Sequence, residues 1–293
     1  MENNLSVIES NPSALADIMG VSQSSGTSRS ALAEVKQIHQ PIMGTKNVDG
    51  EDMEVAVIKA SSYSVTFPDG SMYYSPTVTI RPFMQRFQFH RWDGNYKSDE
   101  GKEGRMLKTV LAKSLNQDLK DNYGGYNCGR PSGYVEDFKA LPSKTQELMR
   151  QTKRVKVMFG LCTLDKPMDE NGEPVDVKEF PFFMNVKNRE SYKNMDAIYN
   201  TIQKKNRLPI HYEILLSGEV KSIPTGATYG VIQAKLGKSV EVTLDDQEVL
   251  NNFVEWVEAT NSMVLNYWAE NNKEVLSQED SDIVGSIVEI DEE

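Results

Sequence analysis

Aromatic and basic side chains are interleaved along the stretch Thr77–Trp92, a combination suited to binding a polyanion that carries flat rings. The stretch holds three arginines and four aromatic residues. Cations of this kind neutralise phosphates, and aromatic rings stack on bases with about 1–3 kcal/mol per base and little sequence preference. The pattern predicts a groove for single-stranded nucleic acid. A second interpretation stays open, in which Phe83, Phe87 and Phe89 are core residues and the arginines are ordinary solvated side chains.

The charge of the chain is divided unevenly between its middle and its ends. Between Pro76 and Gly160 there are 16 lysines and arginines against 9 acidic residues, a balance of +7. The whole chain carries −11, so the remainder carries −18. A cationic middle within an acidic protein favours an anionic partner for that middle.

A glycine-rich loop follows the aromatic stretch and adds tyrosines and an arginine to it. The loop reads Tyr-Gly-Gly-Tyr-Asn-Cys-Gly-Arg over Tyr123–Arg130. Glycines let a backbone approach a ligand closely. The spacing does not match GxxxxGK[ST] or a GxGxxG that opens a helix, so no nucleotide-phosphate motif is present. We interpret the loop as a cover over the groove; a purely structural crossover is the alternative.

The candidate binding residues fall into two groups by chemistry. Cationic side chains are expected to neutralise phosphates, and aromatic ones to stack on bases, although some of the aromatics must instead be core. The first group is Arg81, Arg86, Arg91, Lys108, Lys113 and Arg130; the second is Phe87, Phe89, Trp92, Tyr123, Tyr126 and Tyr134.

Residues with metal-ligating or catalytic chemistry are sparse and scattered. Two cysteines, Cys128 and Cys162, lack CxxC spacing, and the chain has only three histidines. We therefore expect no metal site, no disulfide, no cofactor and no catalytic activity. A metal-dependent nuclease is the enzymatic alternative, and it would need converging carboxylates. The nearest candidates for that role are Asp118, Asp121, Glu136 and Asp137.

Periodicity predicts a chain that is mostly strands in its middle and helical at its end. A Pro-Asp-Gly turn after Phe67 marks a hairpin, and Pro82 predicts a bulge or an edge in the long strand that follows. Apolar residues at helical spacing predict a long helix over 245–271. We expect an α+β fold whose core is an antiparallel, OB-like β-barrel with inserted helices and this long C-terminal helix.

Composition divides the chain into three parts. Residues 1–50 are expected to be a flexible arm with short helices, one of them over 11–20, and residues 51–271 the nucleic-acid-binding core. Residues 272–293 are expected to be a disordered acidic tail, because nine acidic residues and one lysine lie from Glu270 to the end. Such a tail is expected to compete for the cationic groove and to recruit partner proteins; a terminus that only keeps the protein in solution is the alternative. Its candidate partner-binding residues are Asp280, Asp282, Glu289, Asp291, Glu292 and Glu293.

Targeting signals are lacking in the sequence. No run of eighteen apolar residues occurs, and the first residues lack the basic and apolar regions of a signal peptide. We expect a cytoplasmic protein without membrane contact, in the host cytoplasm if a phage encodes it.

The order of these parts resembles that of phage-type single-stranded DNA-binding proteins. The resemblance lies in the arm around Pro12–Gln40, the basic aromatic stretch Arg81–Tyr134 and the tail Asp280–Glu293. It implies sequence-independent binding of single-stranded DNA in replication, recombination or repair. It also implies that the tail contacts replication or recombination proteins. The arm, for its part, is expected to contact a second copy.

Functions of another class stay open beside this one. A protein-binding or virion component would use the basic middle to meet an acidic partner, and would bind oligonucleotides negligibly at low salt. A regulator of transcription would keep DNA binding and contact a polymerase.

Overall fold

The computed structural model describes residues 32–48, 51–97, 101, 103–133, 135–224 and 226–288. For residues 273–288 only the course of the backbone is described. The helix expected over 11–20, the contact of the arm with a second copy and the stacking role of Tyr134 lie outside these residues. So do four of the proposed tail contacts, Glu289, Asp291, Glu292 and Glu293.

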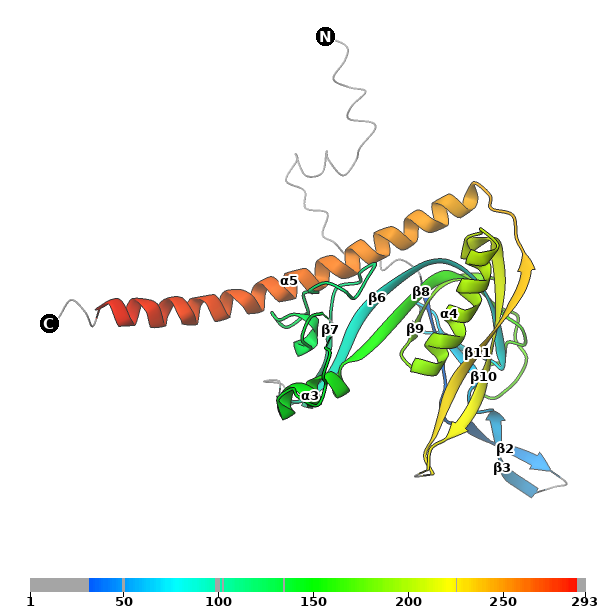
Figure 1. The fold of residues 1–293 in the computed structure, drawn as a ribbon. Coiled ribbons are helices and arrows are strands. Elements are labelled where there is room, and N and C mark those ends of the chain that lie inside the picture. Colours follow the sequence, from blue (N-terminus) through cyan, green and yellow to red (C-terminus); the bar gives the residue numbers. More distant parts are fainter. Residues whose placement is uncertain are drawn as a thin grey trace, which may run out of the picture.

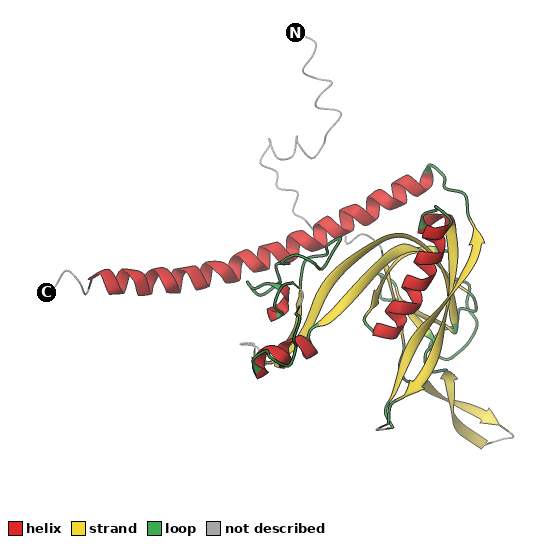
Figure 2. Ribbon diagram, viewed as in Figure 1, coloured by secondary structure: helices red, strands yellow, loops and turns green. Residues whose placement is uncertain are grey.

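A nine-stranded mixed sheet forms the body of the protein (Figure 1, Figure 2). Its strand order is β11-β10-β6-β8-β9-β1-β4-β5, with β7 paired to β6, and β1 runs parallel to β9. The expected antiparallel OB-like barrel is therefore wrong, because within the described residues the sheet is open and contains a parallel pair. The strands of this sheet are β1 (Ala33–Gln37), β4 (Tyr63–Thr66), β5 (Met72–Ser75), β6 (Thr77–Lys97), β7 (Glu103–Lys108), β8 (Lys153–Leu164), β9 (Phe180–Val186), β10 (Tyr212–Ser222) and β11 (Thr228–Ser239).

Strand β6 runs through the centre of the sheet and carries half of the predicted binding residues. It pairs with β8 from Val78 to His90, with β10 at its start and with β7 at its end. The register shifts between Pro82 and Met84, so the bulge predicted at Pro82 is confirmed. A bulge moves every later side chain to the other face, which is why the first half of β6 did not indicate the facing of the second.

Helices cover the two faces of the sheet. On one face α4 (Arg189–Lys204) packs Met195 and Ile202 into the main core. It begins where it does because the Asn188 side chain accepts hydrogen bonds from the backbone N–H groups of Glu190 and Ser191 at 2.8 and 3.3 Å. On the other face α5 (Asp245–Val288) crosses the sheet and buries Phe253 and Val257 in a second core cluster (Figure 1).

The described part of the expected arm, residues 32–48, is made mostly of strands. Ala33 and Val35 of β1 are fully buried between β9 and β4, so this part of the supposed arm belongs to the core. The strands β2 (Ile42–Val48) and β3 (Glu51–Ile58) form a separate two-stranded hairpin that stands away from the main sheet (Figure 1).

The C-terminal helix is longer than its apolar stripe predicts. It does not end near Asn271 but continues to Val288, so the segment expected to be disordered from residue 272 follows a helical course up to that residue. A shorter helix, α3 (Ser143–Gln151), leads into β8, and single 3-10 turns occur at Asn127–Gly129 and Pro209–His211. In the part of the chain that is described, no helix has the length and apolar character needed to cross a membrane.

Candidate nucleic-acid interface

Some of the predicted binding residues lie where β6 pairs with β8, at a distance from the first turn of α5. Phe89 lies directly opposite Arg154 on β8, and Phe87 lies opposite Lys156. Directly opposed residues share a face. This is the α4 face, because Phe87 and Lys156 both lie against Tyr192 of that helix. The ring centres of Phe87 and Tyr192 are 6.3 Å apart, and the Lys156 Nζ lies 4.3 Å from the centre of the Tyr192 ring. The arrangement puts alternating aromatic and cationic positions on one surface.

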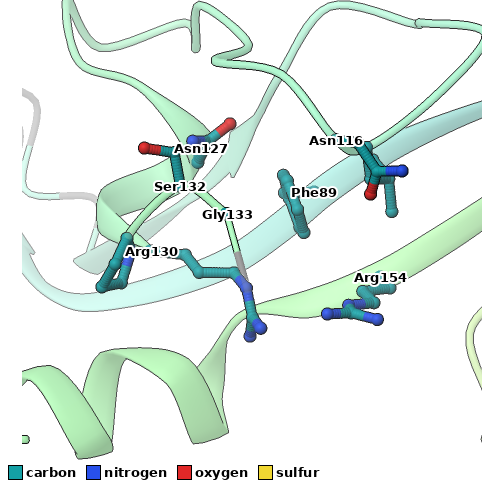
Figure 3. A pocket seen from close by; sticks show the side chains of 9 residues that line it. Phe89, Asn116, Asn127, Arg130, Ser132, Gly133 and Arg154 are labelled. Atoms are coloured by element: carbon teal, nitrogen blue, oxygen red, sulfur yellow. The ribbon is translucent and has the colours of Figure 1, made fainter. Parts of the chain in front are cut away.

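A pocket of 60 Å³ lies on this surface, between β8 and the loop that follows β7. Figure 3 shows the Arg130 and Arg154 side chains extending toward each other, with the Phe89 ring between the loop and the strand. The guanidinium carbon of Arg130 lies 5.9 Å from the centre of the Phe89 ring. Apart from Leu115, the rest of the lining is small or polar: Asn116, Asn127, Pro131, Ser132 and Gly133.

The two arginines of the pocket have no neutralising partner in the part of the chain that the structure describes. Within the described residues neither Arg130 nor Arg154 forms an ion pair with a carboxylate. Burial lowers the pKa of Arg130, and the neighbouring Arg154 charge lowers it further. Two guanidinium groups that repel each other are stabilised by an anion placed between them, and Arg binds phosphate oxygens in bidentate fashion.

The loop that carries Arg130 is fixed by a buried carboxylate. Asp121 is 2 % exposed and accepts backbone N–H groups of Tyr123, Gly125 and Cys128 at 3.0, 3.0 and 3.1 Å. Gly124 has φ +82°, a conformation that favours glycine within this tight loop. The glycine-rich segment is therefore a rigid element held from inside, and not the flexible cover that its composition suggested.

Three of the predicted phosphate ligands make other interactions instead. Arg81 forms an ion pair with Asp246 of α5 at 2.7 Å. Arg91 donates from Nε to the Cys128 carbonyl at 2.7 Å, and Arg86 donates to the Gln85 carbonyl at 2.9 Å. Lys108 and Lys113 are exposed, and Arg130 lines the pocket. The structure thus leaves Lys108, Lys113 and Arg130 available from the predicted cationic set.

The predicted stacking residues divide into core and surface. Phe89 is 3 % exposed and belongs to a core cluster, and Phe87 is half-buried against α4. Trp92, Tyr123 and Tyr126 are 55 %, 48 % and 46 % exposed. These three side chains are therefore the ones that present a ring to solvent.

All three exposed rings already have neighbours within the protein. The Arg105 guanidinium lies 3.2 Å from the centre of the Tyr123 ring and is held by Asp93 at 3.4 Å. Tyr126 meets Trp268 of α5 edge to face, with ring centres 5.9 Å apart. Trp92 covers Gly104, whose absent side chain makes room for the indole. All three are consequently held in defined orientations.

Sequence reasoning missed Arg154, the second arginine of the pocket. The signal for it was the run Lys153-Arg-Val-Lys156 at the start of a predicted strand, where alternation puts Arg154 and Lys156 on one face. Lys156 is 1 % exposed, however, and forms an ion pair with Asp196 beneath the rings of Tyr192 and Tyr199. It stabilises the contact with α4 and does not reach the surface.

The carboxylates considered for a nuclease do not converge. Asp121 is occupied by backbone amides, and Asp118 accepts a hydrogen bond from the Asn127 amide at 2.9 Å. Glu136 and Asp137 are exposed on the segment before α3. Over the described ranges no group of three histidine, cysteine, aspartate or glutamate side chains is placed to hold a metal ion.

Comparison with known proteins gives no further guide to this site. A scan against protein-family models found no match, and searches of curated proteins and of solved structures found none either.

Proposed function

We propose that the protein binds single-stranded DNA without sequence preference, through the α4 face of the β6–β8 region. The observation that carries this is the pocket in which Arg130 and Arg154 converge without a carboxylate. The pocket is a site for one phosphate, and Lys113 adds an exposed cation in the adjoining segment. Contacts of this kind go to the backbone of the polymer and carry no sequence information.

The exposed aromatic residues support a single strand as the ligand in preference to a duplex. Tyr123 and Tyr126 lie on the loop that also carries Arg130. Trp92 lies two residues after His90 on β6, so it faces the opposite side of the sheet near the end of that strand. Rings stack only on bases that are unpaired and turned outward, and any base offers such a face. Replication, recombination and repair are the processes that expose single strands, and we place the protein there.

The acidic end of the chain supports a second part of the proposal. Residues 272–293 are acidic and therefore complementary in charge to the basic face, so they compete with DNA for it. When DNA displaces them, they recruit replication or recombination proteins. The helical course of α5 to Val288 leads away from the sheet (Figure 1).

The test is fluorescence anisotropy of a labelled single-stranded oligonucleotide of roughly 30 nucleotides, longer than the 4–16 nucleotides that one such groove covers. A duplex of equal length is the comparison, and both are titrated at several salt concentrations. We expect tighter binding of the single strand and a steep decline with salt. Equal or negligible binding of both ligands at low salt would contradict the proposal.

A double variant, Arg130→Gln with Arg154→Gln, tests the pocket itself. Each lost phosphate contact should reduce the slope of log K against log salt by about 0.7 for a single strand. The matched control is Arg207→Gln, which removes an exposed arginine beyond the end of α4. An unchanged salt slope in the folded double variant would remove the pocket from the binding surface.

A further inference from the structure

A second cationic cluster lies on the opposite face of the sheet, toward α5. On β8, Lys153 alternates in phase with Val155 and Val157, which pack against Phe253 of that helix. His90 is directly opposite Lys153 on one side and Lys108 on the other. Directly opposed side chains have Cβ atoms about 5 Å apart. His90 is thus flanked by two lysines.

A further lysine acts on the same histidine from the end of β9. Lys187 follows the end of β9 and acts on His90 together with Lys108. Burial lowers the pKa of Lys187, and the neighbouring Lys108 and Lys36 charges lower it further. Glu34 is the nearby carboxylate, and it is engaged by Lys36 at 2.7 Å. Glu34 raises the pKa of Lys187 in turn. Among the described residues it is the acid that acts on this cluster, and because Lys36 also pairs with it, Lys108, Lys153 and Lys187 together keep a net positive charge.

The imidazole at the centre of this cluster has unsatisfied polar atoms. His90 is 4 % exposed, and neither of its ring nitrogens has a hydrogen-bond partner within the described structure. Burial lowers its pKa to about 3, and the Lys187 and Lys108 charges act in the same direction. Buried polar groups almost always have a partner, and an exception calls for a specific explanation such as a bound ion.

We propose that the Lys108–His90–Lys187 cluster is a site for a phosphoryl oxyanion. Lysine ammonium groups bind phosphate oxygens as point charges, and a histidine N–H donates to the same kind of acceptor. The source is either free inorganic phosphate or the backbone of a nucleic acid. This site is independent of the Arg130–Arg154 pocket, because it lies on the other face of the sheet and shares no residue with it.

The histidines of the chain make the site directly observable. There are only three, His39, His90 and His211, so side-chain ¹⁵N–¹H NMR resolves each imidazole, and His90→Gln assigns the signal of interest. The protein is titrated in parallel with inorganic phosphate, with a single-stranded oligonucleotide, and with sodium chloride at matched ionic strength. We expect a saturable shift of the His90 signal alone with phosphate, while the other two signals stay in place.

The three titrations distinguish inorganic phosphate from a nucleic-acid backbone as the ligand, and they also show whether the proposed site is wrong. A shift with the oligonucleotide but not with phosphate supports the site and identifies the nucleic-acid backbone as its ligand. No shift with either, or the same shift with sodium chloride, overturns the proposal. Because DNA binding at the pocket is measured separately by anisotropy, that result leaves the proposed function standing.

Lysine variants supply the second readout. In the double variant Lys108→Gln with Lys187→Gln, the phosphate concentration that gives half of the His90 shift should rise roughly tenfold, because charge-assisted hydrogen bonds are lost. The charge-matched control is Lys193→Gln with Lys235→Gln, two exposed lysines on α4 and β11. Equal titration curves for the two double variants would assign the shift to general charge and not to this site.

Discussion

Arg81 on β6 holds Asp246 in the first turn of α5 through both terminal nitrogens of its guanidinium group, Nη1 and Nη2, at 2.8 and 2.7 Å. The two side chains are 11 % and 6 % exposed. The same arginine donates to the backbone carbonyl of Ile210 at 2.9 Å, and the same aspartate accepts the N–H of Thr243 at 2.7 Å. One ion pair thus fixes where the long helix starts relative to the sheet.

Removing the acid from this pair should destabilise the protein strongly. We expect Asp246→Ala to lower the free energy of unfolding by about 3–5 kcal/mol, because a buried arginine is left without its partner. Urea unfolding measures the change. Asp245→Ala, at the exposed neighbouring position, is the control and should have an effect within about 0.5 kcal/mol. Equal effects of the two variants would contradict the assigned role.

The same pair predicts an acid dependence of stability. Burial raises the pKa of Asp246, but hydrogen bonds from Arg81 and from the Thr243 N–H outweigh it and hold the pKa below its ordinary value. A lowered folded-state pKa contributes stability above the ordinary value of about 3.9, and this contribution is lost as the pH falls further. The difference in unfolding free energy between the wild type and Asp246→Asn should therefore narrow below about pH 4. A difference that does not change with pH would contradict a lowered pKa of Asp246 in the folded state.

Gly160 on β8 lies opposite the bulge of β6 and allows these two strands to approach closely. A Cβ at Gly160 would lie 2.1 Å from the carbonyl oxygen of Arg81, across the ladder from Pro82. We expect Gly160→Ala to cost about 1–3 kcal/mol or more in thermal or urea unfolding, since the clash is with backbone. Gly94→Ala is the matched control: its nearest atom would be 3.6 Å away, on the Trp92 side chain.

Trp92 is the most exposed of the three proposed stacking residues, and it lies on the face of β6 opposite the pocket. Its variant therefore tests whether a bound strand passes over the end of β6. Trp92→Ala should weaken binding of a single-stranded oligonucleotide by about 1 kcal/mol or more if the indole stacks on a base. Anisotropy measures the change, and circular dichroism checks that the variant is folded. Leu208→Ala, which removes a 65 % exposed apolar side chain past α4, should leave the affinity unchanged. An unaltered affinity in folded Trp92→Ala would exclude the indole from the site.

The acidic end can be tested by truncation. Deleting Asp280–Glu293 removes six acidic residues and no basic one. DNA binding should become tighter at low salt, and the difference should shrink as salt screens the charges. An affinity equal to that of the full chain at every salt concentration would leave the segment with a role in solubility only.

Local patterns in the sequence predicted individual elements well but not their arrangement. The turn after Phe67 and the bulge at Pro82 depend on neighbouring residues, and both are confirmed. The pairing of β1 with β9 joins segments far apart in the chain, and no local signal encodes it.

The same limit applies to the candidate site. An arginine at position 81 has the same chemistry as one at position 130, yet the first is paired with Asp246 and the second is not paired. Their roles depend on contacts made by residues far along the chain. Phe89 was likewise a stacking candidate by type, and its burial follows from a loop whose path Asp121 determines.

The position of β1 constrains how the protein is made. Ala33 pairs with Phe182, so the second partner of this N-terminal strand leaves the ribosome only after most of the chain has been synthesised. Until then the edge of β1 that faces β9 carries unpaired backbone groups, which are a template for pairing with another nascent chain. The order of synthesis therefore makes the newborn N-terminal half a client for chaperones, and a fragment that stops at Leu164 should aggregate.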